Sequence, residues 1–188
     1  MSVWVVFAVL ASVLLQFLDW YTTKIFVHYE GADTEANPLF GGSFEKNGVT
    51  SGLLYKKLVL GLFGGILAAL PSSSSSSGFY AHDVLVGLIF LGGTYVVLNN
   101  FSGILIILYK LKTGLSLDIR DNQKPILALN TCVRSLMLTV IFVSVGIYLL
   151  VIYGRTFMFG LATATAMHSI FGFIAFIKFS RRNKNISA

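Results

Sequence analysis

Residues 3–27 read VWVVFAVLASVLLQFLDWYTTKIFV, an apolar stretch in which polar side chains return every three or four residues. About 20 apolar residues are enough for a helix to cross the hydrocarbon core of a bilayer, so this stretch predicts a membrane-spanning helix. Polar side chains spaced by four, three and four residues share one face of a helix. The stretch therefore predicts one polar stripe, made of Ser12, Gln16, Asp19 and Thr23.

The composition of the whole chain is that of an integral membrane protein. Of its 188 residues, 55% are hydrophobic and 12% are charged, and the mean hydropathy is +0.79. Soluble domains carry about 25% charged residues, so we expect much of this apolar surface to face lipid. The single cysteine, Cys132, excludes a disulfide within the chain and a cysteine-based metal site.

Apolar stretches of helical length predict an all-α, polytopic membrane bundle of about five transmembrane helices in one domain, residues 1–188. The first stretch lacks a basic leader, so we expect a retained helix and not a removed signal peptide. Six serines mark an exposed turn within residues 71–83, Gly154-Arg155 predicts a tight hairpin, and the basic tail from Lys178 is expected to fray. The predicted spans are 3–27, 52–70, 84–109, 126–153 and 156–179.

The basic residues predict the orientation of the bundle. With five spans the two termini lie on opposite sides of the membrane. All 14 Lys and Arg residues except Arg155 and the intramembrane Arg134 fall on the side of the C-terminal tail. The positive-inside rule therefore places the N-terminus outside and the C-terminus in the cytoplasm. The net charge of +6 thus meets membrane lipids, and we expect no nucleic-acid partner.

Polar residues in or beside the spans form the candidate ligand- or ion-binding site. A polar group in hydrocarbon is costly, so it usually has a partner or a function. The predicted topology gathers these residues from five segments into the cytoplasmic half, which favours a polar cavity open to the cytoplasm. The candidates are Asp19, Thr22, Thr23, Glu35, Asn37, Lys56, Lys57, Asn99, Asn100 and Arg134, with Asn130 one turn from Arg134.

Each charged candidate also has a structural interpretation. Asp19 either binds a ligand, a proton or a cation, or pairs with Lys56 or Lys57 for assembly alone. Arg134 either clamps a phosphate or carboxylate, or extends to lipid headgroups. Glu35 presents a carboxylate from a re-entrant segment or, as we favour when it is taken alone, belongs to a solvated acidic loop.

Small residues predict close helix contacts, and one of these series contains a histidine. Gly61-x-x-x-Gly65 in the second span permits close helix approach. Gly160, Ala164, His168 and Gly172 recur every four residues in the last span. His168 is either a proton relay or, as we favour, a hydrogen-bonded packing residue.

Asp19-x-x-Thr22, then Glu35-x-Asn37-Pro38, then a lysine opening the next apolar helix, resembles the signature of a family of short prokaryotic membrane proteins with a domain of unknown function. The resemblance covers about residues 16–70, and members of that family are typically shorter than this chain. The resemblance implies a prokaryotic cell membrane and names no activity. The residues that it marks as one unit are Asp19, Thr22, Glu35, Asn37 and Lys56 or Lys57.

Several classes of function lack their motifs in this sequence. No phosphate-binding Gly-rich loop, zinc-protease His-Glu-x-x-His or Gly-x-Ser-x-Gly elbow occurs, so we expect no catalytic residues and no cofactor. Three hypotheses remain: a small transporter or channel for an ion or polar solute, an accessory subunit of a larger membrane complex, and a lipid-headgroup enzyme. Asp19 and Glu35 would hold a divalent cation in that enzyme. A homo-oligomer fits the first hypothesis.

Overall fold

The computed structural model describes residues 3–30, 51–71, 76–114 and 124–186, and this part of the chain is helical with no strand. The all-α prediction is confirmed. The one connection that the structure describes in full, residues 154–156, is a short turn between the last two helices. The elements are α1 (Val3–Glu30), α3 (Ser51–Ala69), α4 (Ser76–Val86), the π-helix η2 (Gly87–Gly92), α5 (Gly93–Thr113), α6 (Lys124–Tyr153) and α7 (Phe157–Ile186).

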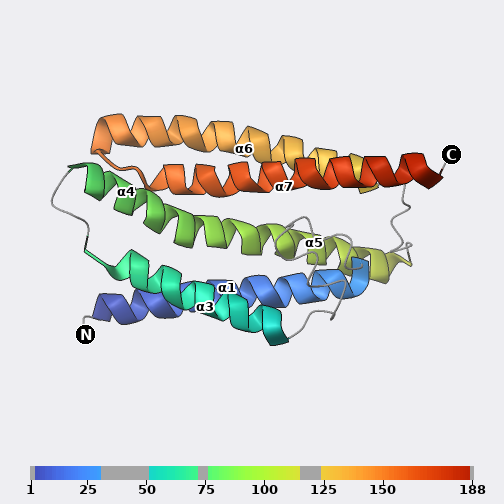
Figure 1. The fold of residues 1–188 in the computed structure, drawn as a ribbon, viewed down its shortest axis with the longest axis horizontal. Helices are drawn as coiled ribbons and strands as arrows, with labels where there is room; N and C mark the ends of the chain where they lie inside the picture. The colour runs from blue at the N-terminus through green and yellow to red at the C-terminus, as the bar shows by residue number, and fades with distance from the viewer. Residues whose placement is uncertain (1–2, 31–50, 72–75, 115–123, 187–188) are drawn as a thin grey trace.

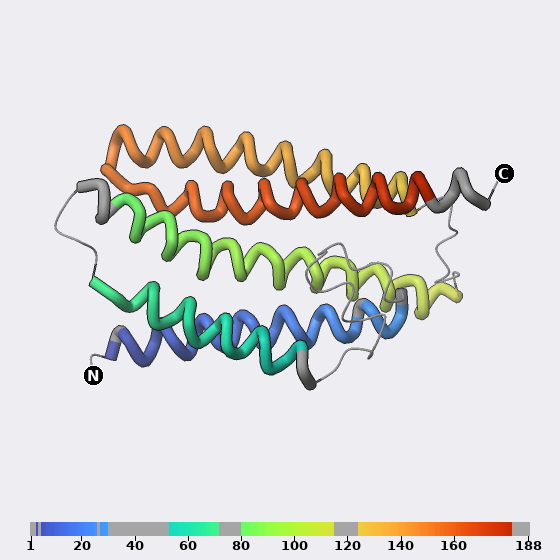
Figure 2. Tube along the Cα trace, viewed as in Figure 1, coloured from blue at the N-terminus to red at the C-terminus, as the bar shows by residue number. Residues whose placement is uncertain are grey.

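The helices lie side by side in three tiers (Figure 1). α1 and α3 form one outer tier, α6 and α7 form the other, and α4, η2 and α5 run as one continuous helix between them (Figure 2). This central helix changes partner along its length, because α4 and η2 pack on α7 whereas α5 packs mainly on α1. α1 begins and α7 ends at opposite ends of the bundle (Figure 1).

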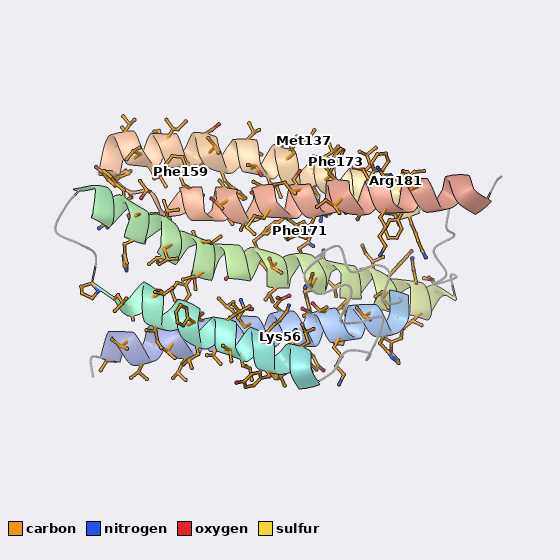
Figure 3. The ribbon with its side chains drawn as sticks, in the orientation of Figure 1. Lys56, Met137, Phe159, Phe171, Phe173 and Arg181 are labelled. Carbon is orange, nitrogen blue, oxygen red and sulfur yellow. The ribbon has the colours of Figure 1, made fainter. Side chains whose placement is uncertain are left out.

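Within the described residues, four helices are long and apolar enough to cross a membrane: Val5–Tyr29, Tyr80–Thr113, Lys124–Tyr153 and Phe157–Arg181. Large apolar side chains such as Met137 and Phe173 are exposed on the tier formed by α6 and α7 (Figure 3), as expected of surfaces that face lipid. α3 has 19 residues, or about 28 Å of helix, and is not one of the four. The integral-membrane class is thus supported, while five spans and their orientation stay predictions.

Both predicted series of small residues serve contacts within the chain. A Cβ added at Gly65 would lie 2.5 Å from Val9 Cα, so α1 and α3 touch backbone to backbone. A Cβ at Gly160 would lie 2.1 Å from the Leu88 nitrogen, and one at Gly172 would lie 2.9 Å from the Cys132 nitrogen. α7 is therefore held against η2 on one side and α6 on the other.

The predicted turn at residues 71–83 is wrong in its second half, because α4 begins at Ser76. Contacts with the hairpin between α6 and α7 explain this early start. The Thr156 hydroxyl donates to the Tyr80 carbonyl (2.8 Å), and the Thr156 N–H donates to Asp83 Oδ2 (3.3 Å). Arg155 lies 3.7 Å from Asp83 Oδ1. Gly154 has a φ of +62°, as a tight hairpin requires.

The expectation of a frayed tail from Lys178 is also wrong, because α7 continues to Ile186. Phe179 is 7% exposed and packs with Ala175 against Ala128 of α6. This apolar contact gives the last turns of α7 a tertiary partner, and tertiary packing supplies most helix stability in proteins.

Candidate functional site

Asp19 of α1 and Lys57 of α3 form an ion pair inside the bundle. The Lys57 ammonium donates to Asp19 Oδ2, and the side chains of Lys57 and Asp19 are only 7% and 16% exposed, respectively. The close glycine contact between α1 and α3 brings the two helices within reach of this pairing. Lys56, the neighbouring lysine, is exposed (Figure 3), so the structure distinguishes two residues that the sequence left equivalent.

Asn100 of α5 completes what we name the Asp19 cluster, which consists of Asp19, Thr22, Thr23, Lys57 and Asn100. The Asn100 amide nitrogen donates to Asp19 Oδ1 (3.0 Å) and lies near the hydroxyls of Thr22 (3.3 Å) and Thr23 (3.4 Å). The Thr23 hydroxyl also lies 3.4 Å from Asp19 Oδ1. Both threonines are buried. The carboxylate therefore accepts from three side chains, and its charge is balanced by Lys57.

Asn99 joins a second group, the Asn99 cluster, which consists of Tyr95, Asn99, Arg134, Ser135 and His168. Arg134 of α6 donates to Asn99 Oδ1, which leaves the amide nitrogen to donate to His168 Nε2 (3.4 Å). Tyr95 places its ring edge-on to His168, with centroids 5.8 Å apart, and its hydroxyl lies 3.2 Å from the Ser135 hydroxyl. Arg134 itself is exposed.

Tyr95 and Ser135 were not predicted as site residues. Tyr95 lies four residues before Asn99, so it shares a helical face with a predicted candidate. That spacing is a signal that the sequence does carry. Ser135 is fully buried beside the exposed Arg134, and nothing in the sequence distinguishes it from the other serines.

A cavity of about 280 Å³ lies between α1, α3, η2, α5 and α7. Its polar lining comes from Ser12, Gln16 and Asp19 on one side and His168 on the other. In the part of the chain that the structure describes, no group hydrogen-bonds the Gln16 amide. The rest of the wall is largely apolar and includes Leu60, Leu88, Ile89, Val96, Met167 and Phe171.

The π-helical segment η2 forms part of this cavity wall through Leu88, Ile89 and Gly92. π segments interrupt α-helices frequently at functional sites. Here the segment lies where the helix meets α7, since a Cβ at Gly87 would lie 1.8 Å from the Phe157 oxygen. Nothing in the sequence indicated this segment.

Three predicted candidates remain: Glu35, Asn37 and Asn130. Glu35 and Asn37 fall outside the described residues, so a divalent-cation site shared by Asp19 and Glu35 stays a prediction. Asn130 is exposed, and among the described residues no hydrogen bond joins it to either cluster. Within residues 3–30, 51–71, 76–114 and 124–186, no group of three or more His, Cys, Asp or Glu side chains is placed to hold a metal ion.

Comparison with known proteins identifies no relative. No protein-family model matches the chain, and neither a curated protein nor a solved structure does. The function must therefore be inferred from the geometry of the two clusters and the cavity.

Proposed function

We propose that this protein is a small transporter or channel that binds a small cation at Asp19. The candidate cations are a proton, Na⁺ and a small protonated amine. One observation supports this choice above the others: the Asp19 carboxylate belongs both to a buried ion pair and to the wall of a cavity. A carboxylate that served assembly alone would need the ion pair but not the cavity.

The ion pair provides a mechanism for exchange. A buried charge without a partner costs several kcal/mol, so the cluster favours one cation beside Asp19 at a time. A cation that enters the cavity meets the carboxylate from the side of Gln16, and Lys57 meets it from α3. Binding of the guest would displace the Lys57 ammonium, which would then give up its proton, because a second buried positive charge would otherwise remain in the cluster. Departure of the guest and return of the proton to Lys57 would restore the ion pair.

The remaining donors suit a small cation. Ser12 and Gln16 precede Asp19 by two turns and one turn on the same face, and all three line the cavity. Hydroxyl, amide and carboxylate oxygens are ligands that hard cations prefer. A volume of about 280 Å³ lies just below the range of roughly 300–1,000 Å³ that is typical of drug-sized ligands.

The two other hypotheses gain less from the structure. The glycine series that would offer docking faces to a partner subunit are occupied by helices of the same chain. Among the described residues, Asp19 belongs to no group of three or more His, Cys, Asp or Glu side chains that could hold a divalent cation.

The test is cation flux across the membrane of liposomes that contain the purified protein. Proton entry is followed with a pH-sensitive dye in the lumen, and Na⁺ and methylamine uptake are followed with radioactive tracers. We expect at least one flux above that of protein-free liposomes, a loss of tenfold or more in Asp19→Asn, and wild-type flux in Lys56→Gln. Wild-type flux equal to protein-free liposomes for all three cations would refute the proposal, as would full activity in Asp19→Asn.

A further inference from the structure

A second cavity, of about 810 Å³, lies between the end of α1 and α5. None of the residues that line it also lines the Asp19 cavity. We name it the α1/α5 groove, and its lining residues are Tyr21, Lys24, Ile25, Val27, His28, Tyr29, Ile104 and Leu108.

One side of the α1/α5 groove is cationic and aromatic. Lys24 and His28 lie one turn apart on α1. The Lys24 ammonium lies 5.3 Å from the centre of the Trp20 ring, and His28 contacts the Tyr29 ring edge-on at 5.0 Å. Among the described residues, no carboxylate forms a salt bridge with Lys24 or His28. Lys24 therefore gives the groove a positive charge that no carboxylate of the described residues balances.

The other side of the groove is apolar. Ile104 is 7% exposed and forms a buried floor, whereas Leu108 is 52% exposed and continues the apolar surface outward. Tyr21 and Tyr29 of α1 are exposed at 49% and 40%, respectively. Tyrosine, tryptophan and lysine at the end of an apolar helix mark the depth of the lipid headgroups. By this rule, we expect the groove to lie at the boundary between headgroups and acyl chains.

We propose that the α1/α5 groove binds one anionic phospholipid. Its phosphate would lie between Lys24 and His28, and an acyl chain would cover Ile104 and Leu108. The positive charge of Lys24 favours a net-negative headgroup. The apolar floor favours a lipid over a free phosphate ion, which could use only the cationic side.

Native mass spectrometry of the full chain in mild detergent tests this site. Phosphatidylglycerol and phosphatidylcholine of equal chain length are added separately, and the lipid-bound fraction is measured. We expect the wild-type protein to retain phosphatidylglycerol at least tenfold more tightly than phosphatidylcholine. Lys24→Gln should weaken that binding by about fivefold, and Lys24→Gln with His28→Gln should weaken it further. Lys112→Gln removes the same charge outside the groove and should bind as the wild type does.

Three results would overturn the lipid site. The first is equal retention of the two lipids by the wild-type protein. The second is equal retention of phosphatidylglycerol by Lys24→Gln and Lys112→Gln at unchanged helical content. The third is displacement of the lipid by millimolar inorganic phosphate, which would make the groove a site for free anions. The outcome is independent of cation flux, because none of the variants alters the Asp19 cluster.

Discussion

Asn99 and Asn100 are neighbours on α5, yet they serve clusters of opposite character. Asn100 joins the Asp19 cluster, in which a carboxylate and an ammonium balance each other in a buried setting. Asn99 joins the Asn99 cluster, in which Arg134 bonds to an amide and is exposed on α6. The sequence marks both asparagines as candidates for one site, whereas the structure places them in different electrostatic environments.

The difference teaches which contacts hold the bundle together. Removal of one partner from a buried ion pair leaves a charge without compensation, and that penalty is large. Removal of an exposed arginine leaves an amide that other groups can satisfy, and that penalty is small. Stability should therefore depend mainly on the Asp19 cluster, and the predictions below test this ranking from the largest effect to the smallest.

Lys57→Met should have the largest effect, with a loss of about 3–5 kcal/mol in the free energy of unfolding. Methionine keeps the length of the side chain but leaves the Asp19 carboxylate without its cation. Denaturant unfolding in detergent measures this loss. Lys56→Met is the matched control, because this exposed neighbour should change stability by less than about 0.5 kcal/mol. Equal losses in the two variants would contradict the assignment of Lys57 as the buried partner.

Asp19→Asn combined with Lys57→Met should regain most of that loss and unfold within about 1 kcal/mol of the wild type. The double variant has no unpaired charge in the cluster, and the amide oxygen introduced at position 19 can still accept from Asn100. The same unfolding assay applies. If the loss in the free energy of unfolding of the double variant equalled the sum of the losses of Asp19→Asn and Lys57→Met, the two residues would not be coupled.

Asn100→Ala should cost about 1.5–3 kcal/mol, because its amide donates to a charged carboxylate. Asn99→Ala should cost less, about 0.6 kcal/mol, because its charged partner Arg134 is exposed and can bond to other groups once the amide is removed. The contrast between adjacent positions on one helix is measured by unfolding both variants in parallel. A larger loss at Asn99 would reverse the ranking of the two clusters.

Arg134→Leu should have the smallest effect, within about 0.5 kcal/mol of the wild type. Its side chain is exposed, so leucine places an apolar group on the outer surface of α6 without leaving a buried charge. Thermal unfolding in detergent checks this. A loss above about 2 kcal/mol would show that Arg134 holds α5 and α6 together.

The class of fold follows from the sequence because hydrophobic length and helical periodicity are local properties. The spacing of Ser12, Gln16 and Asp19 predicts a shared face, and the structure places all three on one cavity. The Gly61 and Gly65 contacts follow equally from their spacing. In each case the information lies within one helix.

Properties that depend on a second helix could not be predicted in the same way. The choice between Lys56 and Lys57 depends on the rotation of α3 against α1, and the separation of Asn99 from Asn100 depends on both neighbours of α5. The early start of α4 depends on Thr156 and Asp83, which are 73 residues apart. The π segment η2 depends on the close approach of Gly87 to Phe157.

The most direct test of the central claim is cation flux through liposomes that contain the Asp19→Asn, Lys57→Met double variant. This variant separates a structural ion pair from a cation site, because it is expected to fold without carrying the Asp19 carboxylate. Our account predicts wild-type helical content and flux equal to protein-free liposomes. Wild-type flux from the folded double variant would contradict it and would make the pair a device for helix assembly.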